Sequence, residues 1–197
     1  MRFALVAVAL IACGKDAGSE QPPNGSNAQR EQAQFDHERR PDLIVAALEI
    51  GPGARVADIG AGSGLLTVHL ARAVAPNGKV IATDTNKEVL NMLKSRLTIA
   101  GLADIVEGRA VDPDKPGLEA GQYDAILLSE VDHYFTDEVK WLRDVTPALK
   151  ANGRIVISNR IHHRAAAMDA AQKAGLVLKS ETSPVPTHYI AVFVTKK

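Results

Sequence analysis

Three glycines separated by single residues follow a short apolar run in the stretch VADIGAGSGLL, residues 56–66. Glycine lacks a Cβ, so the chain can turn tightly there and a ligand can approach the backbone. Asp58 precedes the first glycine by two residues, and Asp84 ends a second apolar run, VIATD. A carboxylate at the end of that second run can accept charged hydrogen bonds from both hydroxyls of a ribose. The pattern therefore predicts a ligand that contains a nucleoside.

The elements that must position these residues alternate between helical and strand-like patterns from Pro41 onward. Apolar residues at helical spacing predict helices over residues 41–50, 64–74, 86–101, 136–150 and 163–175, with Thr136 as the N-cap of the fourth. Apolar runs predict strands over residues 54–60, 79–84, 103–108, 123–130, 153–159, 176–182 and 189–197. Strict alternation favours an α/β fold with a doubly wound, mostly parallel sheet. The last two strands follow each other directly, which predicts an antiparallel hairpin at one edge and hence a mixed sheet.

Composition limits the classes of function. Lys plus Arg and Asp plus Glu each number 23, so no global basic field attracts nucleic acid. The chain has one cysteine, which excludes an internal disulfide framework and a cysteine-based metal site. We therefore expect a small-molecule partner rather than nucleic acid.

The N-terminus predicts export. One positive charge precedes the apolar run ALVAVALIA, which is far shorter than the roughly 20 residues that span a bilayer. The four residues LIAC, ending at Cys13, resemble the lipobox of bacterial lipoproteins, in which the cysteine becomes the lipidated N-terminus. The resemblance implies a signal peptide over residues 1–12 and a membrane anchor only through Cys13, in the bacterial cell envelope at the periplasmic face or the outer membrane. A buried cysteine, or a cytoplasmic protein whose signal is not used, is the alternative.

The segment that follows is rich in polar and charged residues, with Phe35 as its only large apolar side chain. Such composition buries too little apolar area to offset the entropy of ordering. We therefore expect residues 13–40 to form a lipidated, disordered tether, and residues 41–197 to form the folded domain.

The glycine spacing separates two kinds of nucleoside cofactor. A dinucleotide fingerprint would need a glycine where Leu65 stands. Instead, DIGAGSG resembles motif I of the class I S-adenosylmethionine-dependent methyltransferases, a family with a Rossmann-like fold. VIATD, YDAILLSE and LKANGRIVIS resemble the second, fourth and fifth strand regions of that family, so that the resemblance covers nearly all of residues 41–197.

The resemblance implies S-adenosyl-L-methionine as the cofactor and a methyl acceptor as the substrate. It implies cofactor-binding roles for Asp58, Gly60, Ala61, Gly62, Thr83, Asp84, Asn86, Ala110, Asp112 and Ser129. Family members often have an acid where this chain has Arg109, which weakens the expected adenine contact and favours Asp112 as its replacement. A non-catalytic lipoprotein that binds S-adenosylmethionine or a related nucleoside is therefore the alternative, and a purely structural lipoprotein is a third.

Methyl transfer from a sulfonium depends mainly on positioning and desolvation, although a base helps when the acceptor is a hydroxyl or an ammonium. The stretch SEVDHYF, residues 129–135, follows the fourth strand and supplies the candidates Glu130, His133 and Tyr134. His133 also matches a histidine in a subgroup of small predicted methyltransferases that this part of the sequence resembles, but it could instead cap or pack against the next helix. The adjacent His162 and His163 lack the i, i+4 spacing of helical metal ligands, so we predict no metal site.

Overall fold

The computed structural model describes residues 24–196, with side chains from residue 27. The predicted signal peptide and Cys13 lie outside the described residues. The helices are α1 (Asn24–Arg39), α2 (Pro41–Leu48), α3 (Thr67–Val74), α4 (Lys87–Ile99), α5 (Glu138–Val145) and α6 (Arg164–Lys173). The strands are β1 (Arg55–Ile59), β2 (Lys79–Asp84), β3 (Val106–Ala110), β4 (Tyr123–Ser129), β5 (Leu149–Arg160), β6 (Leu176–Val185) and β7 (His188–Thr195).

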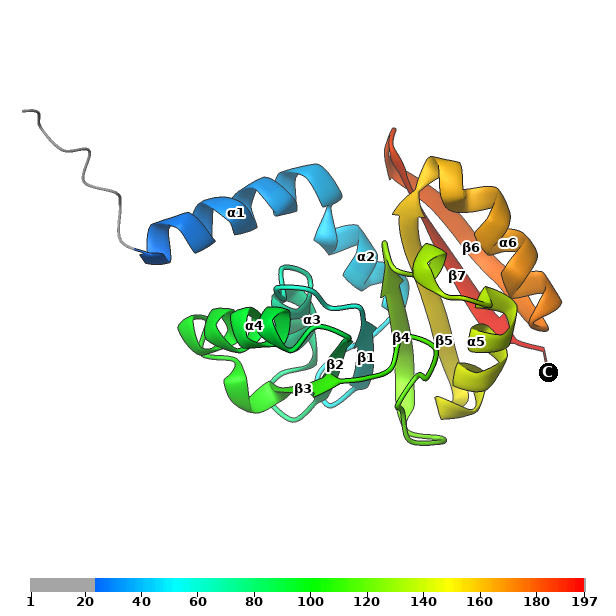
Figure 1. The fold of residues 1–197 in the computed structure, drawn as a ribbon, viewed down its shortest axis with the longest axis horizontal. Helices are drawn as coiled ribbons and strands as arrows, with labels where there is room; N and C mark the ends of the chain where they lie inside the picture. The colour runs from blue at the N-terminus through cyan, green and yellow to red at the C-terminus, as the bar shows by residue number, and fades with distance from the viewer. Residues whose placement is uncertain (1–23, 197) are drawn as a thin grey trace, which may run out of the picture.

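The seven strands of residues 24–196 form one sheet in the order β3-β2-β1-β4-β5-β7-β6 (Figure 1). The first five strands run parallel, whereas β7 is antiparallel to both β5 and β6. The predicted mixed, doubly wound sheet with a C-terminal antiparallel hairpin is therefore confirmed. The chain order reverses between β1 and β4, which places a crevice beyond their carboxyl ends, where open α/β sheets bind ligands.

The central strands are buried on both faces because helices cover each side of the sheet. Ile126 and Leu128 of β4 pack into a cluster with α5 and α6, whereas Ala125 and Leu127 pack on the other face with α2 and α3. This burial explains why the sequence of β4 is continuously apolar rather than alternating.

The expected tether is wrong over residues 24–39, which form the helix α1. Its contacts are mostly polar: Gln32 donates to the Leu65 carbonyl oxygen at 2.9 Å, and Asp36 lies 2.7 Å from a ring nitrogen of His69. Arg96 of α4 forms an ion pair with Glu31. The prediction of disorder considered only the small apolar area that this segment can bury. Hydrogen bonds and ion pairs to α3, α4 and the residues before α3 hold the helix instead. In Figure 1, α1 lies across one end of the molecule, above α3 and α4.

Several boundaries also differ from expectation: the helix predicted over residues 136–150 ends at Val145, and β5 begins at Leu149. Residues 103–105 form a 3₁₀ turn, so that β3 begins at Val106. Asp137 rather than Thr136 caps α5, with its side chain accepting from the Lys140 backbone N–H at 2.9 Å. Thr136 instead bonds through both its backbone N–H and its hydroxyl to Asp114.

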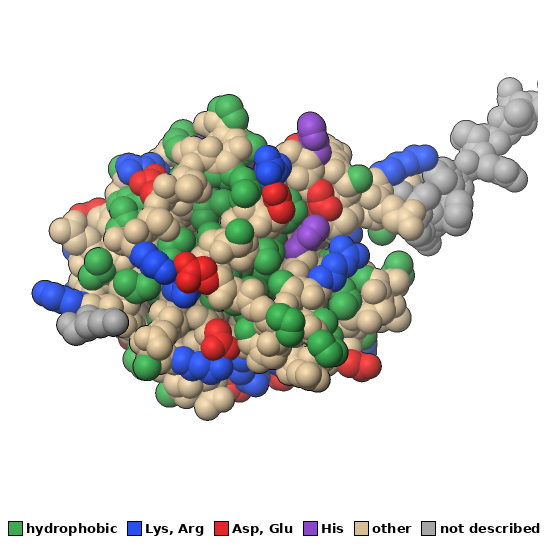
Figure 2. All heavy atoms as spheres, turned by 180° about the vertical axis from the view of Figure 1, so that it is seen from behind, with side chains coloured by type: hydrophobic (Ala, Val, Ile, Leu, Met, Phe, Trp, Pro, Cys, Tyr) green, Lys and Arg blue, Asp and Glu red, His purple; other side chains and the backbone are tan. Residues whose placement is uncertain are grey.

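On the face shown in Figure 2, basic and acidic side chains lie interspersed rather than gathered into a single-sign patch. Within residues 24–196, no helix has the length and apolar character needed to cross a membrane.

Candidate functional site

The glycine turn lies at the carboxyl end of β1, between β2 and β4. Gly60 adopts φ +66°, and a Cβ there would lie 2.5 Å from a methyl carbon of Val131, so only glycine lets the two segments approach this closely. Gly62 adopts φ +55° and would meet no atom within 4 Å, which leaves the backbone open to a ligand. The turn therefore combines close packing on one side with open space on the other.

Asp84 connects the end of β2 to this turn. One of its carboxylate oxygens accepts from the backbone N–H of Gly62 at 3.0 Å, and the other accepts from the backbone N–H of Asn86 at 2.9 Å. Asn86 in turn caps α4, where its side chain accepts from the Glu88 backbone N–H at 2.8 Å. The carboxylate keeps further lone pairs, since each oxygen offers two. It can therefore hold the turn and bind hydroxyl groups at once.

Asp58 is buried beneath the turn, with 2% of its surface exposed. Burial raises its pKa to about 6, although the Thr67 hydroxyl opposes the rise by donating to the carboxylate at 2.6 Å; the charge of Asp84 adds to the rise. Because this carboxylate has one hydrogen-bond donor beside it and almost no solvent exposure, a nearby cation would stabilise its ionised form. The ammonium of an amino acid ligand would supply one.

Two neighbouring cavities open from these residues. The larger, of about 400 Å³, is lined by Gly60, Thr83, Asp84, Asp112, Tyr134 and Trp141 among others. The smaller, of about 150 Å³, is lined by Asp58, Ala61, Gly62 and Ser129 among others. Both are lined by Gly60 and Glu130, so the two cavities meet at the turn.

Most of the predicted cofactor residues therefore come together. Eight of the ten line one of the two cavities: Asp58, Gly60, Ala61, Gly62, Thr83, Asp84, Asp112 and Ser129. Asn86 and Ala110 do not; Asn86 caps α4, and Ala110 pairs with Asp84 across β2 and β3. The Thr83 hydroxyl is buried with no hydrogen-bond partner among the described residues, which leaves an unused polar group at the cavity wall.

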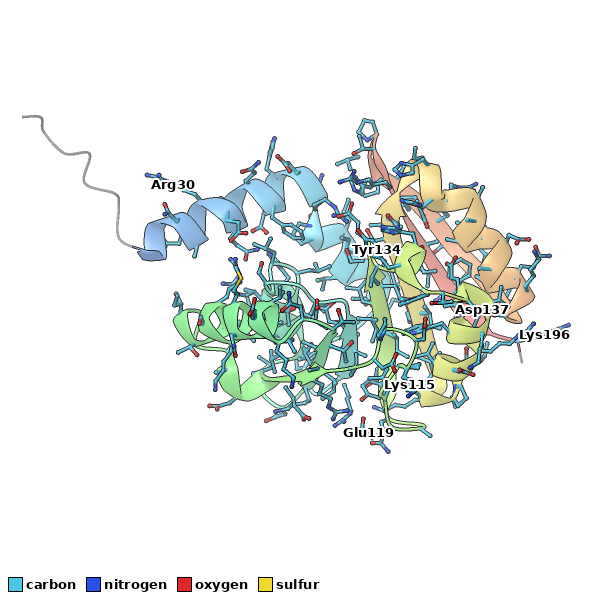
Figure 3. All side chains as sticks on the ribbon, viewed as in Figure 1. Arg30, Lys115, Glu119, Tyr134, Asp137 and Lys196 are labelled. Atoms are coloured by element: carbon cyan, nitrogen blue, oxygen red, sulfur yellow. The ribbon has the colours of Figure 1, made fainter. Side chains whose placement is uncertain are left out.

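Arg109 does not obstruct the larger cavity. Its guanidinium forms ion pairs with Glu107 and Glu119 and donates to the Gly117 carbonyl oxygen at 3.2 Å. Glu119 also pairs with Arg55, the first residue of β1, at the end of the sheet opposite the glycine turn. Figure 3 shows Glu119 far from Tyr134, which lies near the end of β4. Hydrogen bonding to Glu119 raises the pKa of Arg109, and the charge of Arg109 is therefore paired with Glu119, away from the larger cavity.

Glu130 occupies the junction of the cavities in a left-handed backbone conformation, φ +53°. Its carboxylate forms ion pairs with Arg39 and Arg160 and lies 3.2 Å from a ring nitrogen of His188. Desolvation raises the pKa of Glu130, but Arg39, His188 and Arg160 together outweigh this and hold the pKa below its usual value. Glu130 is therefore ionised at neutral pH.

Of the three candidate catalytic residues, Glu130 and Tyr134 line the larger cavity, and the His133 ring lies 4.1 Å from that of Tyr134, centre to centre. Tyr134 lines the larger cavity and is 73% exposed, whereas His133 lines neither cavity. The His133 ring stacks on His163 with centroids 4.1 Å apart, and its Nδ1 lies 3.0 Å from the side-chain nitrogen of Asn159. His133 thus contacts the turn that precedes α6, and it lies outside both cavities. Among the described residues, no group of three or more His, Cys, Asp or Glu is arranged to hold a metal ion.

Sequence reasoning missed the contribution of α1. Phe35 and Arg39 both line the smaller cavity, and the Arg39 guanidinium lies 5.8 Å from the centre of the Phe35 ring. The four-residue spacing of the only large apolar side chain and a basic residue could have indicated one face of a helix. Low overall hydrophobicity concealed this signal.

A glycine turn, a second-strand acid and two cavities at the switch point of a doubly wound sheet define a Rossmann-like domain that binds a nucleoside cofactor. A family model described as a methyltransferase domain matches residues 57–155. The chain therefore belongs to the methyltransferase domain family, and S-adenosylmethionine is the cofactor that this membership supports.

Known proteins agree with the family. The ubiquinone/menaquinone biosynthesis C-methyltransferase of Vibrio cholerae is 31% identical over 106 residues, which cover 54% of this chain and 41% of that enzyme. The chain thus matches less than half the length of this relative. A SAM-dependent methyltransferase of Aquifex aeolicus shares the fold with a TM-score of 0.76 at 18% identity, covering 86% of this chain and 97% of that one. A SAM-dependent O-methyltransferase of Thermotoga maritima gives 0.68 at 22% identity, covering 81% and 66%.

Proposed function

We propose that this protein transfers the methyl group of S-adenosylmethionine to a small-molecule acceptor. The observation that carries the proposal is the placement of Asp58 and Asp84 on either side of a glycine turn that opens into two neighbouring cavities. The buried, unpartnered Thr83 hydroxyl and the open space beside Gly62 fit a polar ligand at this wall. Arg109, which supported the non-catalytic alternative, is bound elsewhere, so this reason for the alternative falls away.

The cofactor would be held in two parts. Asp84 is placed to accept from the ribose hydroxyls, with Thr83 beside it. Asp112 and Tyr134 line the rest of the larger cavity, whose size suits the adenosine portion. Asp58, Gly60 and Gly62 enclose the smaller cavity, which suits the methionine portion. When bound, S-adenosylmethionine supplies an electrophilic methyl group on sulfur.

The acceptor has a separate space. A third cavity of about 610 Å³ is lined by Phe35, Arg39, Leu65 and Glu130, which also line the smaller cavity. Its volume lies within the range of small-molecule sites. An acceptor there would lie beside the smaller cavity, across these four shared residues, and positioning and exclusion of water would supply most of the catalysis. Glu130 is the one candidate catalytic residue that lines all three cavities.

The test is calorimetric titration of the full chain with S-adenosylmethionine and S-adenosylhomocysteine. We expect both to bind, followed by release of S-adenosylhomocysteine when a panel of small hydroxy, amino and carbon acceptors is supplied. The variant Asp84→Ala is the control and should lose most of the affinity. Absence of binding by the folded wild-type chain would refute the proposal.

We further propose that Cys13 anchors the protein in the bacterial cell envelope. The support is the signal-length apolar run and the LIAC sequence before the domain. Fractionation of the expressing bacterium tests this: the wild type should sediment with membranes and the variant Cys13→Ser should not. A wild type that stays in the cytoplasmic fraction would refute the anchor.

A further inference from the structure

The third cavity, which the proposed function assigns to the methyl acceptor, joins an apolar surface to a basic one. Phe35 of α1 and Leu65, directly after the glycine turn, are apolar residues that also line the smaller cavity. Of the described lysines and arginines, Arg39 at the end of α1 and Arg160 at the end of β5 line the third cavity. A ligand complementary to this wall combines an apolar body with an anionic group.

The two arginines outnumber the acid between them. Glu130 forms ion pairs with both, and it lies 3.2 Å from a ring nitrogen of His188. Burial lowers the pKa of His188, and the two arginine charges add to this effect, although Glu130 opposes it. His188 is therefore uncharged at neutral pH, and the group carries one net positive charge. Glu38, the remaining acid in the wall, is exposed, so water screens its charge.

Both arginines keep unused hydrogen-bond donors. Arg160 donates from its Nε to Glu130 at 2.9 Å and its side chain is 63% exposed, which leaves its terminal nitrogens open to a ligand. Arg39 is buried, and its Nε has no hydrogen-bond partner among the described residues. A guanidinium presents five N–H donors in a fork that matches the oxygens of a carboxylate or phosphate. The wall therefore offers both the charge and the donors that such an anion needs.

The arrangement of the wall also sets an orientation for the acceptor. Arg160 lines neither the larger nor the smaller cavity, whereas Phe35 and Leu65 lie where the third cavity meets the smaller one. An acceptor bound through an acid group at Arg160 would place its apolar body beside the cofactor. The acid group would then lie away from the methyl donor, where it contributes to binding and does not react.

We propose that the methyl acceptor is a small organic acid whose carboxylate or phosphate binds to Arg160, supported by the charge of Arg39, and whose apolar body lies beside the cofactor. The inference deepens the proposed function and rests on it. An atom of the body would form the bond to the methyl carbon with its own electron pair, and the electrons of the broken carbon–sulfur bond would stay on sulfur. A hydroxyl acceptor would release its proton to water. The acid group is unchanged, so the product keeps its negative charge.

The experiment uses the full chain saturated with S-adenosylhomocysteine and measures the affinity of three fragments by ligand-observed NMR titration. Benzoate and phenyl phosphate carry the two kinds of acid, and benzamide is the uncharged counterpart of benzoate. We expect at least one acid to bind about 10- to 100-fold more tightly than benzamide, the range for hydrogen bonds to charged groups. Tighter binding of benzoate or of phenyl phosphate assigns the acid group as a carboxylate or a phosphate.

Variants test whether Arg160 is responsible for the preference. In Arg160→Gln, the preferred acid should lose about tenfold or more in affinity, whereas benzamide and S-adenosylhomocysteine should each change by less than about threefold. Arg160→Lys keeps the charge and should keep part of the preference for the acid. Thermal melting of each variant confirms that the domain is folded.

Arg164→Gln is the matched control. Arg164 of α6 also pairs with a glutamate through its Nε, but it does not line the third cavity. This variant should bind the acids and benzamide as the wild type does.

The outcomes separate the two proposals. If the wild type does not bind S-adenosylhomocysteine, the proposed function fails and this inference fails with it. If the cofactor product binds but neither acid binds more tightly than benzamide, the proposed function stands and the acceptor is not an acid. Equal loss of acids and benzamide in Arg160→Gln, or an equal loss of the acids in Arg164→Gln, would show that Arg160 does not bind the acid group. A product of the acceptor panel that is methylated on its acid oxygen would overturn the orientation.

Discussion

The buried carboxylate of Asp58 should destabilise the protein in the absence of cofactor. Burial raises its pKa from 3.8 to about 6. The folded state therefore binds this proton more tightly than the unfolded state, and the free energy of unfolding falls as pH rises between these two values. A difference of about two pKa units corresponds to about 3 kcal/mol, lost by pH 7 and fully present below pH 4.

The variant Asp58→Asn removes the ionisation while keeping an oxygen that can accept from the Thr67 hydroxyl. At pH 7.5, we expect it to be more stable than wild type by up to about 3 kcal/mol. Near pH 4, the two proteins should be nearly equal, because Asp58 is then largely protonated in the folded state. Urea unfolding of both proteins at several pH values between 4 and 8 measures the difference.

The same change should weaken cofactor binding, because an amide cannot pair with an ammonium as a carboxylate does. The loss of affinity for S-adenosylhomocysteine at pH 7.5 should be about tenfold or more. If the stability difference between Asp58→Asn and the wild type does not grow between pH 4 and pH 7.5, Asp58 is ionised without cost in the folded state. The reasoning about its burial would then be refuted.

Four further changes test separate parts of the structure. Asp84→Ala should weaken binding of S-adenosylhomocysteine by about 1.5–3 kcal/mol in calorimetry, and unchanged affinity would remove Asp84 from the site. Gly60→Ala should lower the free energy of unfolding in urea by about 2 kcal/mol or more, because its Cβ would lie 2.5 Å from a valine methyl carbon. Gly62→Ala places its Cβ in open space and should lower the free energy of unfolding by about 1 kcal/mol through its left-handed backbone. Equal costs would contradict the packing at the turn. Arg109→Ala should leave affinity for S-adenosylhomocysteine within about twofold, since its contacts are with Glu107 and Glu119; a larger loss would place it in the adenine site.

The sheet and the position of the two carboxylates beside the glycine turn could be predicted because their signals are local. A continuous apolar run is enough to predict a strand such as β4. The position of an acid at the end of a strand then follows from the prediction of that strand alone. The pairing of Asp84 with the turn at Gly62 follows from the parallel register of β1 and β2. The role of His133 could not be settled in this way, because its contact with His163 joins segments thirty residues apart.

The sequence by itself determined the α/β fold, the glycine turn and the two carboxylates beside it, since strand periodicity and backbone freedom are properties of short segments. Only the tertiary structure decided which side chains close the site. Arg109 stands on a strand next to the site, yet its charge is bound by Glu119 at the other end of the sheet. Arg39 stands in a polar segment that composition assigns to a tether, yet ion pairs and hydrogen bonds to α3 and α4 bring it to the glycine turn. Such contacts depend on the distance between elements far apart in the chain, and that distance is fixed only when the domain folds.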